Sequence, residues 1–366
     1  MCIRDSPKTE DLLDDSNDAP VIRLINAILS EAIKDGASDI HIEPYEENLS
    51  VRFRIDGILK EKLNPSSRIA PLLNARIKVM SNLDIAERRI PQDGRMSLKL
   101  GEKWVDIRVS TLPSSFGERL VLRLLDKADA SLDLEDLGMT SEMTKDYLQQ
   151  LKSTSGIILV TGPTGSGKTT TLYSGLNFLN DQTRNILTVE DPIEYALEGV
   201  GQTQVNNKVG LSFSKGLRAI LRQDPDVVMV GEIRDKETAE TAIQASLTGH
   251  LVLSTIHTND SVGAITRLID MGVEPYLLAS TLKMVIAQRL VRKLTNKNEF
   301  SGRVGIFEMI KIDSDIRNFI NETIDEDKIR KVAFKKYNSL LNDGEEKVKK
   351  GITSELEIKR VLKQVD

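Results

Sequence analysis

The chain has 366 residues, which is enough for two or three domains of ordinary size. Its 55 acidic and 50 basic side chains give a formal net charge of −5, and 40% of the residues are hydrophobic. These values exclude a disordered chain, a collagen and a coiled-coil rod, and an aromatic content of 4% argues against a surface for stacking nucleic-acid bases.

The N-terminal residues 1–18 are polar and acidic, show no periodicity, and are expected to be a disordered tail or a scar of sequence assembly. The segment Met1–Ser6 lacks the apolar core of a signal peptide. Cys2 is the only cysteine, which excludes an internal disulfide and a zinc site made of cysteines. No apolar run approaches the roughly 18 residues that cross a bilayer, so we expect a cytoplasmic protein.

Residues 19–128 are expected to form a small α+β domain. Apolar residues recur at helical spacing over Val21–Ile33, and Gly36 lies where this helix would end. Strict alternation of apolar and charged residues predicts a half-buried strand over Leu49–Ile55. Further strands are expected at Trp104–Thr111 and Arg119–Leu125. One helix followed by several half-exposed strands is typical of the α+β class.

Residues 129–140 are charged and irregular, and they are expected to be a linker to a second domain over residues 141–366. Short apolar runs without alternation recur in this part, as is typical of strands buried on both faces by helices. They are Gly156–Val160, Ile186–Val189, Val227–Val230 and Leu251–Ser254, with helical stretches such as Thr169–Leu179 and Lys236–Leu247 between them. We predict an α/β domain with a mainly parallel sheet, and a helical, lysine-rich chain after Ile306.

A glycine-rich motif follows the first of these apolar runs. It reads Gly162-Pro163-Thr164-Gly165-Ser166-Gly167-Lys168-Thr169, fits the pattern G-x4-G-K-S/T, and with Thr170 forms the expected ATP-binding segment. Glycines let backbone N–H groups converge on phosphate oxygens, and the following helix adds the positive end of its dipole. Lys168 is expected to bridge the β- and γ-phosphates, and Thr169 to give a hydroxyl ligand to Mg²⁺. The complete motif with its flanks disfavours a glycine-rich turn without a ligand.

Two glutamates end apolar runs downstream of this loop. Hydrolysis needs one carboxylate that orients water and another near the metal, and Glu190 and Glu232 are the candidates. Either one alone would be interpreted as a solvated loop residue, but the pair favours a hydrolytic site at the carboxyl ends of the strands. Gly231 stands where the second motif ordinarily has Asp, so Glu232 is expected to contact the metal through water.

Histidines and arginines offer weaker signals. His250 and His257 flank the run Leu251–Ser254, and His257 is either a γ-phosphate sensor or an imidazole satisfied in the core. Arg218 and Arg222 lie four residues apart on a predicted helix. For these arginines and for Arg108 and Arg123 on the N-terminal strands, one interpretation is an exposed face and the other is an arginine finger. Fingers from the first domain would need domain closure or a neighbouring subunit.

Together these segments resemble the secretion ATPase superfamily, and most closely its branch that assembles type II secretion pseudopili and type IV pili. The resemblance runs from about Ala19 to the C-terminus. Its motifs are Ser38–Pro44, Arg89–Arg95, Glu190–Glu194, Leu221–Asp226 with Gly231–Asp235, and Thr248–Asp260. It implies a RecA-like P-loop ATPase domain behind a smaller N-terminal α+β domain, and Mg²⁺-dependent ATP hydrolysis coupled to secretion or pilus assembly.

The resemblance also implies roles for single residues. Glu190 matches the position that activates water, Glu232 the Walker B glutamate that supports Mg²⁺, and His257 the histidine that senses the phosphate state. The arginines with implied roles are Arg108 and Arg123, which reach the nucleotide from the N-terminal domain, and Arg218, Arg222 and Arg303, which lie near the phosphates in the ATPase domain.

Further implications concern assembly. Members of the superfamily form homo-hexamers that act on an inner-membrane platform protein and other components of the secretion or pilus machinery. This protein would then be cytoplasmic, peripheral to the inner membrane through partners, and without direct nucleic-acid contact. Two departures stand out. Thr295 occupies the place of the first cysteine of a tetracysteine loop, so no zinc is expected. The chain as given is also expected to begin after the extra N-terminal domain that binds the membrane anchor in many relatives.

Three alternatives remain open at this point. A pilus retraction ATPase of the same superfamily would share the core motifs, although Ser38–Pro44 and Gln223–Pro225 are more like the assembly branch. A nucleic-acid motor of the conjugation type is disfavoured by the acidic charge and the few aromatic residues. A scaffold without hydrolysis is disfavoured by the presence of Lys168, Glu190 and Glu232.

Overall fold

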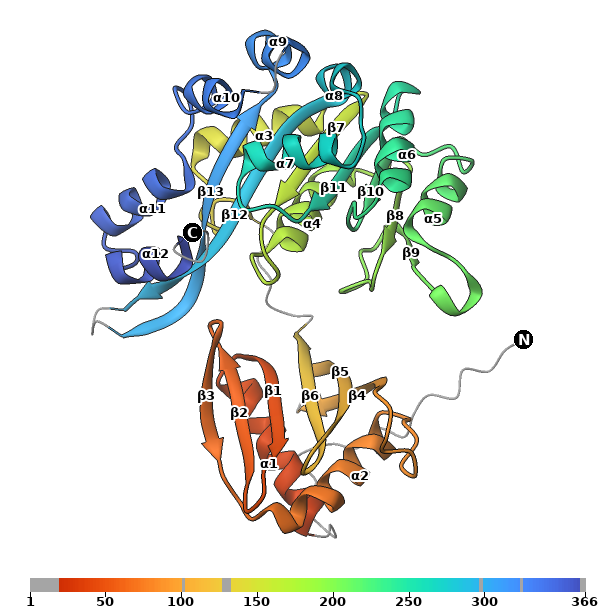
Figure 1. The fold of residues 1–366 in the computed structure, drawn as a ribbon, viewed down its shortest axis with the longest axis vertical. Coiled ribbons are helices and arrows are strands. Elements are labelled where there is room, and N and C mark those ends of the chain that lie inside the picture. Colours follow the sequence, from red (N-terminus) through yellow and green to blue (C-terminus); the bar gives the residue numbers. More distant parts are fainter. Residues whose placement is uncertain (1–19, 101–102, 127–132, 296–298, 323–324, 363–366) are drawn as a thin grey trace. The chain divides into compact units, whose positions relative to one another are not determined.

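The structure is a computed structural model that describes residues 20–100, 103–126, 133–295, 299–322 and 325–362 (Figure 1). The chain divides into two compact units, Met1–Ala130 and Ser131–Asp366, and each is described by itself. The expected tail over residues 1–18 lies outside the described residues, as does the first part of the expected linker, residues 129–132.

The N-terminal unit is a six-stranded antiparallel sheet whose apolar face packs against two helices (Figure 1). Its elements are α1 (Pro20–Lys34), β1 (Ala37–Pro44), β2 (Leu49–Ile55), β3 (Ile58–Leu63), α2 (Ala70–Met80), β4 (Gln92–Leu100), β5 (Lys103–Ser114) and β6 (Gly117–Asp126), and the strand order is β3-β2-β1-β6-β5-β4. Along β1, Ile40 and Ile42 belong to the core shared with the helices. Because side chains alternate along a strand, Asp39 and His41 belong to the opposite face.

Charged residues cross this opposite face in a row. Arg95, Arg108, Arg123, Asp39 and Arg54 lie directly opposite one another in turn on five neighbouring strands. Arg123 Nε donates a hydrogen bond of 2.9 Å to Asp39 Oδ1. Arg108 and Arg123, the candidate fingers, are therefore side by side on the face of the sheet that faces away from the core.

The C-terminal unit is built around a seven-stranded sheet in the order β13-β12-β7-β11-β10-β8-β9. The strands are β7 (Gly156–Thr161), β8 (Ile186–Glu190), β9 (Gly201–Gln204), β10 (Val227–Val230), β11 (Leu251–Ile256), β12 (Leu282–Leu294) and β13 (Phe300–Lys311). The strands from β12 to β9 in this order are parallel, and β13 is antiparallel to β12. This arrangement confirms the predicted α/β class and the mainly parallel sheet.

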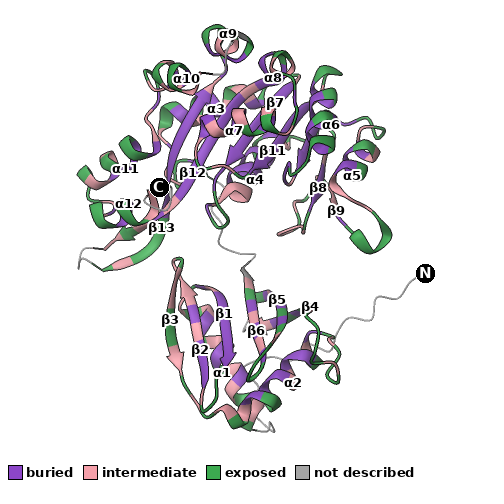
Figure 2. Cartoon of the chain, viewed as in Figure 1, coloured by how far each residue is buried: buried purple, intermediate pink, exposed green. Residues whose placement is uncertain are grey.

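Helices cover both faces of this sheet, and Figure 2 shows the resulting burial of its strands. The helices are α3 (Ser141–Leu151), α4 (Lys168–Leu179), α5 (Phe213–Ile220), α6 (Lys236–Leu247), α7 (Ser261–Asp270), α8 (Pro275–Thr281), α9 (Ser314–Glu322), α10 (Glu326–Ala333), α11 (Leu340–Lys349) and α12 (Glu355–Leu362). Along β7, Ile158 and Val160 pack with α3 and α4, whereas Ile157 and Leu159 pack with α5 to α8. Burial on both faces explains why the strand runs of the sequence do not alternate.

One expectation from the sequence needs correction. The chain after Ile306 continues as strand β13 to Lys311, because Val304–Ile310 is buried on both faces beside β12, and helices begin only at Ser314. In the described end of the expected linker, two apolar residues pack inward and the charged residues are exposed. Leu134 and Met139 are buried in the same core as α3. Among the described helices, none combines the length and apolar character that crossing a lipid bilayer demands.

Candidate active site

The loop between β7 and α4 adopts a shape that requires glycine. Gly162, Gly165 and Gly167 have φ angles of +148°, +78° and +88°. A Cβ on Gly162 would lie 2.4 Å from the carbonyl oxygen of Gln288, and one on Gly167 would lie 2.7 Å from the side-chain nitrogen of Gln288. The loop is thus pressed against β12 and turns directly into the first helical residue, Lys168.

Lys168 lies folded over this loop. Its Nζ donates hydrogen bonds to the carbonyl oxygens of Gly162 (2.9 Å) and Pro163 (3.0 Å). Burial lowers the pKa of Lys168 to about 8, an effect that Arg289 reinforces and Glu232 opposes. Neutral carbonyl acceptors form weaker bonds with an ammonium than phosphate oxygens do, so an anionic ligand can displace them.

The other residues of the predicted ATP-binding segment lie in the turn or in the first turn of α4. Pro163, Thr164 and Gly165 are exposed, and Thr169 and Thr170 are half-buried. Ser166 is buried, and its Oγ has no hydrogen-bond partner among the described residues. The Oγ1 of the following Thr171 donates a 2.6 Å bond to Gln288 Oε1, which ties α4 to β12 from the inside.

Glu232 comes directly after β10 and Gly231, close to the phosphate loop. Its Oε1 forms an ion pair with Arg234, and its Oε2 lies 3.5 Å from His257 Nε2. Glu232 is buried, yet Oε2 accepts no hydrogen bond from a described residue. Because β11 lies between β7 and β10 in a parallel sheet, the residues after these strands gather at one edge. The structure therefore brings together Lys168, Glu232 and His257.

His257 is half exposed, with 49% of its side chain accessible. Burial of the remainder and then the charge of Lys168 lower the pKa of His257, while Glu232 opposes them. Its neighbour Thr258 is fixed to the end of β7, because Thr258 N donates to Thr161 Oγ1 (3.0 Å) and the two hydroxyls are 2.7 Å apart. His250, at the other end of β11, bonds to Ala245 and Thr248 instead.

Glu190 ends β8 and is engaged by protein groups on both carboxylate oxygens. The Tyr173 hydroxyl donates a short hydrogen bond to Oε2. Thr188 Oγ1 (2.6 Å) and Gln202 Nε2 (3.0 Å) donate to Oε1. Burial, and then this bond to Glu190, raise the pKa of Tyr173. The carboxylate is buried and held by these three bonds, so in this arrangement it is not presented to a water molecule.

Two of the predicted arginines of the C-terminal unit contact residues outside the phosphate loop. Arg218 Nη2 lies 2.9 Å from Glu237 Oε1 at the start of α6, and both side chains are about half exposed. Arg222 follows the end of α5 and donates 2.9 Å to the Arg218 carbonyl oxygen. Arg303 is exposed on β13, opposite Arg292 of β12. Arg108 and Arg123 belong to the N-terminal unit.

Two residues behind the loop were missed in the sequence. Gln288 and Arg289 on β12 are 1% and 3% exposed. Arg289 Nη2 donates 2.6 Å to the Asn259 carbonyl oxygen, and Nη1 donates 3.2 Å to the Gln288 carbonyl oxygen. Burial lowers the pKa of Arg289. The signal was present, because two polar residues interrupt an otherwise apolar run from Val285 to Val291.

A magnesium ion fits this site if most of its ligands come from phosphate and water. Among the described residues, no three His, Cys, Asp or Glu side chains gather as a metal-binding group. Mg²⁺ in nucleotide sites ordinarily keeps several waters and uses one or two protein oxygens besides the phosphates. The buried Glu232 Oε2, which lacks a hydrogen bond, and the Thr169 hydroxyl are suitable oxygens. The expected absence of zinc stays a prediction.

Comparisons with known proteins find similarity to proteins of secretion systems. The family described as "Type II/IV secretion system protein" matches residues 14–363. Type II secretion system protein E of Pseudomonas aeruginosa is 54% identical over an alignment 394 positions long, which covers 98% of this chain and 78% of that protein. Type II secretion system ATPase E of Vibrio cholerae is 53% identical with the same coverage.

Solved structures show the same fold. The ATPase DotB of Legionella pneumophila matches with a TM-score of 0.75 at 24% identity, covering 96% of this chain and 98% of that one. The pilus retraction motor PilT with bound ADP matches with a TM-score of 0.67 at 29% identity, covering 91% of this chain and 95% of that one. These matches bear out the predicted RecA-like ATPase fold.

Proposed function

The chain belongs to the Type II/IV secretion system protein family, and on this basis we propose that it is the ATP-hydrolysing motor of a type II secretion system. The observation that carries the proposal is the phosphate loop with Lys168, Glu232 and His257 gathered at one edge of the sheet. The identity of more than half to secretion proteins E over nearly the whole chain selects this activity among P-loop enzymes.

The site suggests how ATP is held. The backbone N–H groups of Gly165 to Thr169 receive the phosphates, and Lys168 exchanges its two carbonyl partners for phosphate oxygens. We propose that Thr169 and, through water, Glu232 hold Mg²⁺, which when bound neutralises part of the phosphate charge. Arg234 stays paired with Glu232 and fixes the orientation of that carboxylate.

Water activation is proposed for Glu190, after its release from Tyr173. In the described arrangement the carboxylate is locked in the protein, so its use in hydrolysis requires it to exchange a donor for water. We propose that His257, beside Glu232 and within the field of Lys168, reports the phosphate state to the loop that follows β11. A depressed pKa keeps its imidazole neutral near pH 7, able to donate or accept a hydrogen bond.

Arg108, Arg123, Arg218, Arg222 and Arg303 are proposed to approach the phosphates during the cycle. For Arg218 this requires release of its exposed ion pair with Glu237, a pair of the kind that contributes only about 0–1 kcal/mol. Arg108 and Arg123 lie together on an open sheet face, which suits delivery of positive charge from a second surface.

The assembly is proposed by likeness to the family. Relatives named as parts of type II secretion systems support action together with other secretion components. We propose a homo-hexamer that works on an inner-membrane platform protein from the cytoplasmic side, without direct nucleic-acid contact. We also propose residues 19–128 as an N-terminal domain that moves against an ATPase domain over residues 141–366.

Purified full-length protein tests this function. ATP hydrolysis should require Mg²⁺ and should be lost in Lys168→Ala, because the loop then lacks its phosphate-binding ammonium. Activity that persists in Lys168→Ala, or that needs added DNA, would contradict the proposal. The likeness to PilT supports a retraction motor as the second candidate. Gene deletion separates the two, because loss of secretion supports assembly and surplus immobile pili support retraction.

A further inference from the structure

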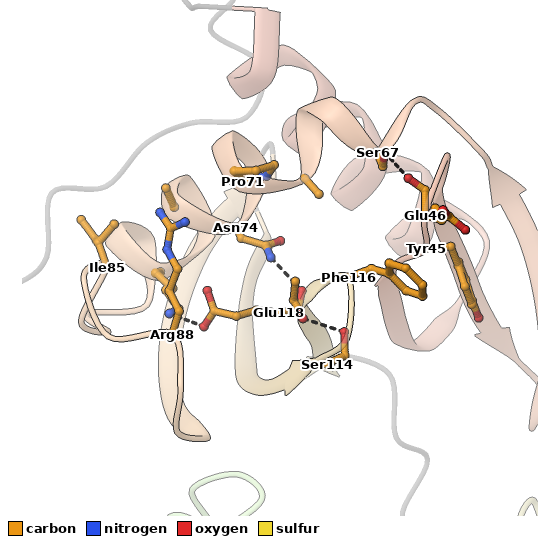
Figure 3. A pocket seen from close by; sticks show the side chains of 14 residues that line it. Tyr45, Glu46, Ser67, Pro71, Asn74, Ile85, Arg88, Ser114, Phe116 and Glu118 are labelled. Carbon is orange, nitrogen blue, oxygen red and sulfur yellow. Dashed lines mark hydrogen bonds and ion pairs between the residues drawn. The ribbon is translucent and has the colours of Figure 1, made fainter.

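A pocket of about 250 Å³ opens in the N-terminal unit (Figure 3). Helix α2 forms one wall, and the turns β1–β2 and β5–β6 and the loop before β4 form the others. Asn74, Lys78 and Glu118 line its buried floor, and Tyr45, Ile85 and Phe116 line its exposed rim.

The charges on the floor satisfy each other. The Lys78 ammonium forms an ion pair with Glu118 and donates a 2.7 Å hydrogen bond to the Glu87 carbonyl oxygen. Both side chains are at least 95% buried. An anion or cation placed at the floor would therefore meet an adjacent like charge in a poorly solvated place, so the floor favours a neutral group. The other charged side chains of the lining, Glu46 and Arg88, are exposed and do not belong to the buried floor.

Asn74 gives the floor a neutral hydrogen-bond acceptor that no donor of the described residues satisfies. Its Nδ2 donates 2.7 Å to the Glu118 carbonyl oxygen, whereas its Oδ1 has no hydrogen-bond partner in the described part of the chain. The residue is only 5% exposed, so an acceptor left without a donor here is unfavourable. Figure 3 shows the amide pointing into the pocket from α2. An occupant that donates a hydrogen bond at this depth would satisfy the amide oxygen.

The rim supplies apolar contact. Tyr45, Ile85 and Phe116 are each about half exposed, and the two aromatic rings lie near each other at one end of the pocket (Figure 3). Beyond the rim, Leu72 and Val79 of α2 are also exposed and lie seven residues apart, on one face of the helix. Helix α2 thus carries exposed apolar side chains besides the residues of the pocket, as expected where a protein segment docks around one anchoring side chain.

We propose that this pocket binds the side chain of a tryptophan from a partner protein. Indole has a donor and no acceptor, which matches the open oxygen of Asn74 beside a self-neutralised ion pair. Its planar apolar body suits the rings of the rim, and its size suits a pocket of about 250 Å³. Tryptophan is also the residue type most typical of interface anchors.

Three probes test the proposal on the full chain: indole, 1-methylindole, which lacks the N–H donor, and N-acetyl-tryptophanamide, which mimics the residue in a peptide. Binding is followed by the methyl resonance of Ile85 in an isoleucine-labelled sample, with Ile90, which does not line the pocket, as internal reference. Indole and N-acetyl-tryptophanamide should shift the Ile85 signal to saturation. The loss of one hydrogen bond should weaken 1-methylindole about three- to tenfold.

Matched variants locate the binding. Phe116→Ala removes a rim side chain that is 53% exposed, and Leu112→Ala removes one that is 52% exposed and does not line the pocket. Only Phe116→Ala should weaken the binding of indole and of N-acetyl-tryptophanamide. Equal binding of indole and 1-methylindole, or unaltered binding in Phe116→Ala, would overturn the proposal. Binding of indole without N-acetyl-tryptophanamide would assign the pocket to a free small molecule and would refute the partner side chain.

Discussion

Removal of the hydrogen bond between Tyr173 and Glu190 is expected to lower the stability of the fold and to raise the rate of ATP turnover. In Tyr173→Phe the carboxylate keeps Thr188 and Gln202 but loses a buried donor. A hydrogen bond to a charged group is worth about 1.5–3 kcal/mol, so the free energy of unfolding should fall by about that amount. If the Glu190 carboxylate must leave Tyr173 to contact water, the hydrogen-bond energy no longer opposes this release in the variant. Each 1.4 kcal/mol removed raises the population of released carboxylate about tenfold.

Turnover by Tyr173→Phe should accordingly rise, by about tenfold or more until another step becomes limiting. Tyr147→Phe is the matched control, because Tyr147 is equally buried on the same core but donates 3.3 Å to the neutral Thr171 carbonyl oxygen. The control should lose only about 0.5–1.5 kcal/mol and keep its turnover number. Urea unfolding and steady-state phosphate release measure the two quantities. A turnover number that falls in Tyr173→Phe while ATP binding is retained would show that the bond holds Glu190 in its working position, and would refute its sequestration.

The affinity for ATP should fall as pH rises above about 8, because Lys168 then loses its proton when no nucleotide is bound. Bound phosphate raises the pKa of Lys168, so by linkage the affinity falls at most about tenfold per pH unit. A pH titration of nucleotide binding measures this, and Lys168→Arg, which stays charged, should flatten the profile. Glu232→Gln should bind ATP but hydrolyse it about a hundredfold more slowly or worse, and a wild-type rate in a phosphate-release assay would contradict the role of this carboxylate. Arg108→Ala and Arg123→Ala should each lose hydrolysis with nucleotide binding largely kept, and unchanged turnover in both would leave them as residues of an exposed sheet face.

The sequence predicted those parts of the fold that depend on local pattern. The phosphate loop and the four buried strands β7, β8, β10 and β11 are encoded in short contiguous runs, and their parallel order places Lys168, Glu232 and His257 at one edge. Strand β13 was missed because its buried run Val304–Ile310 has neither helical nor alternating period. The partner on β12 that makes it a strand is contributed by a separate segment of the chain.

The local sequence pattern could not predict which side chains pair across the site. The residues around Glu190 do not indicate that Tyr173, 17 residues earlier, donates a hydrogen bond to its carboxylate. The family resemblance implied that Arg218 lies near the phosphates, but its ion pair with Glu237 on the next helix could not be predicted from its own segment. Arg289 carried a visible signal, a charged residue within an apolar run, but its contact with Asn259 depends on packing between β12 and the loop after β11.

That loop connects the nucleotide edge to the rest of the unit. Thr258 is bonded to Thr161 at the start of the phosphate loop, and the Asn259 carbonyl oxygen accepts from the buried Arg289. Asp260 caps α7 and forms a 2.8 Å ion pair with Arg330 of α10. The backbone after His257 is therefore fixed at three consecutive residues to three different elements. If phosphate binding or release displaces the backbone at His257, these bonds must strain or their partners must move, which would carry the displacement toward the C-terminal helices.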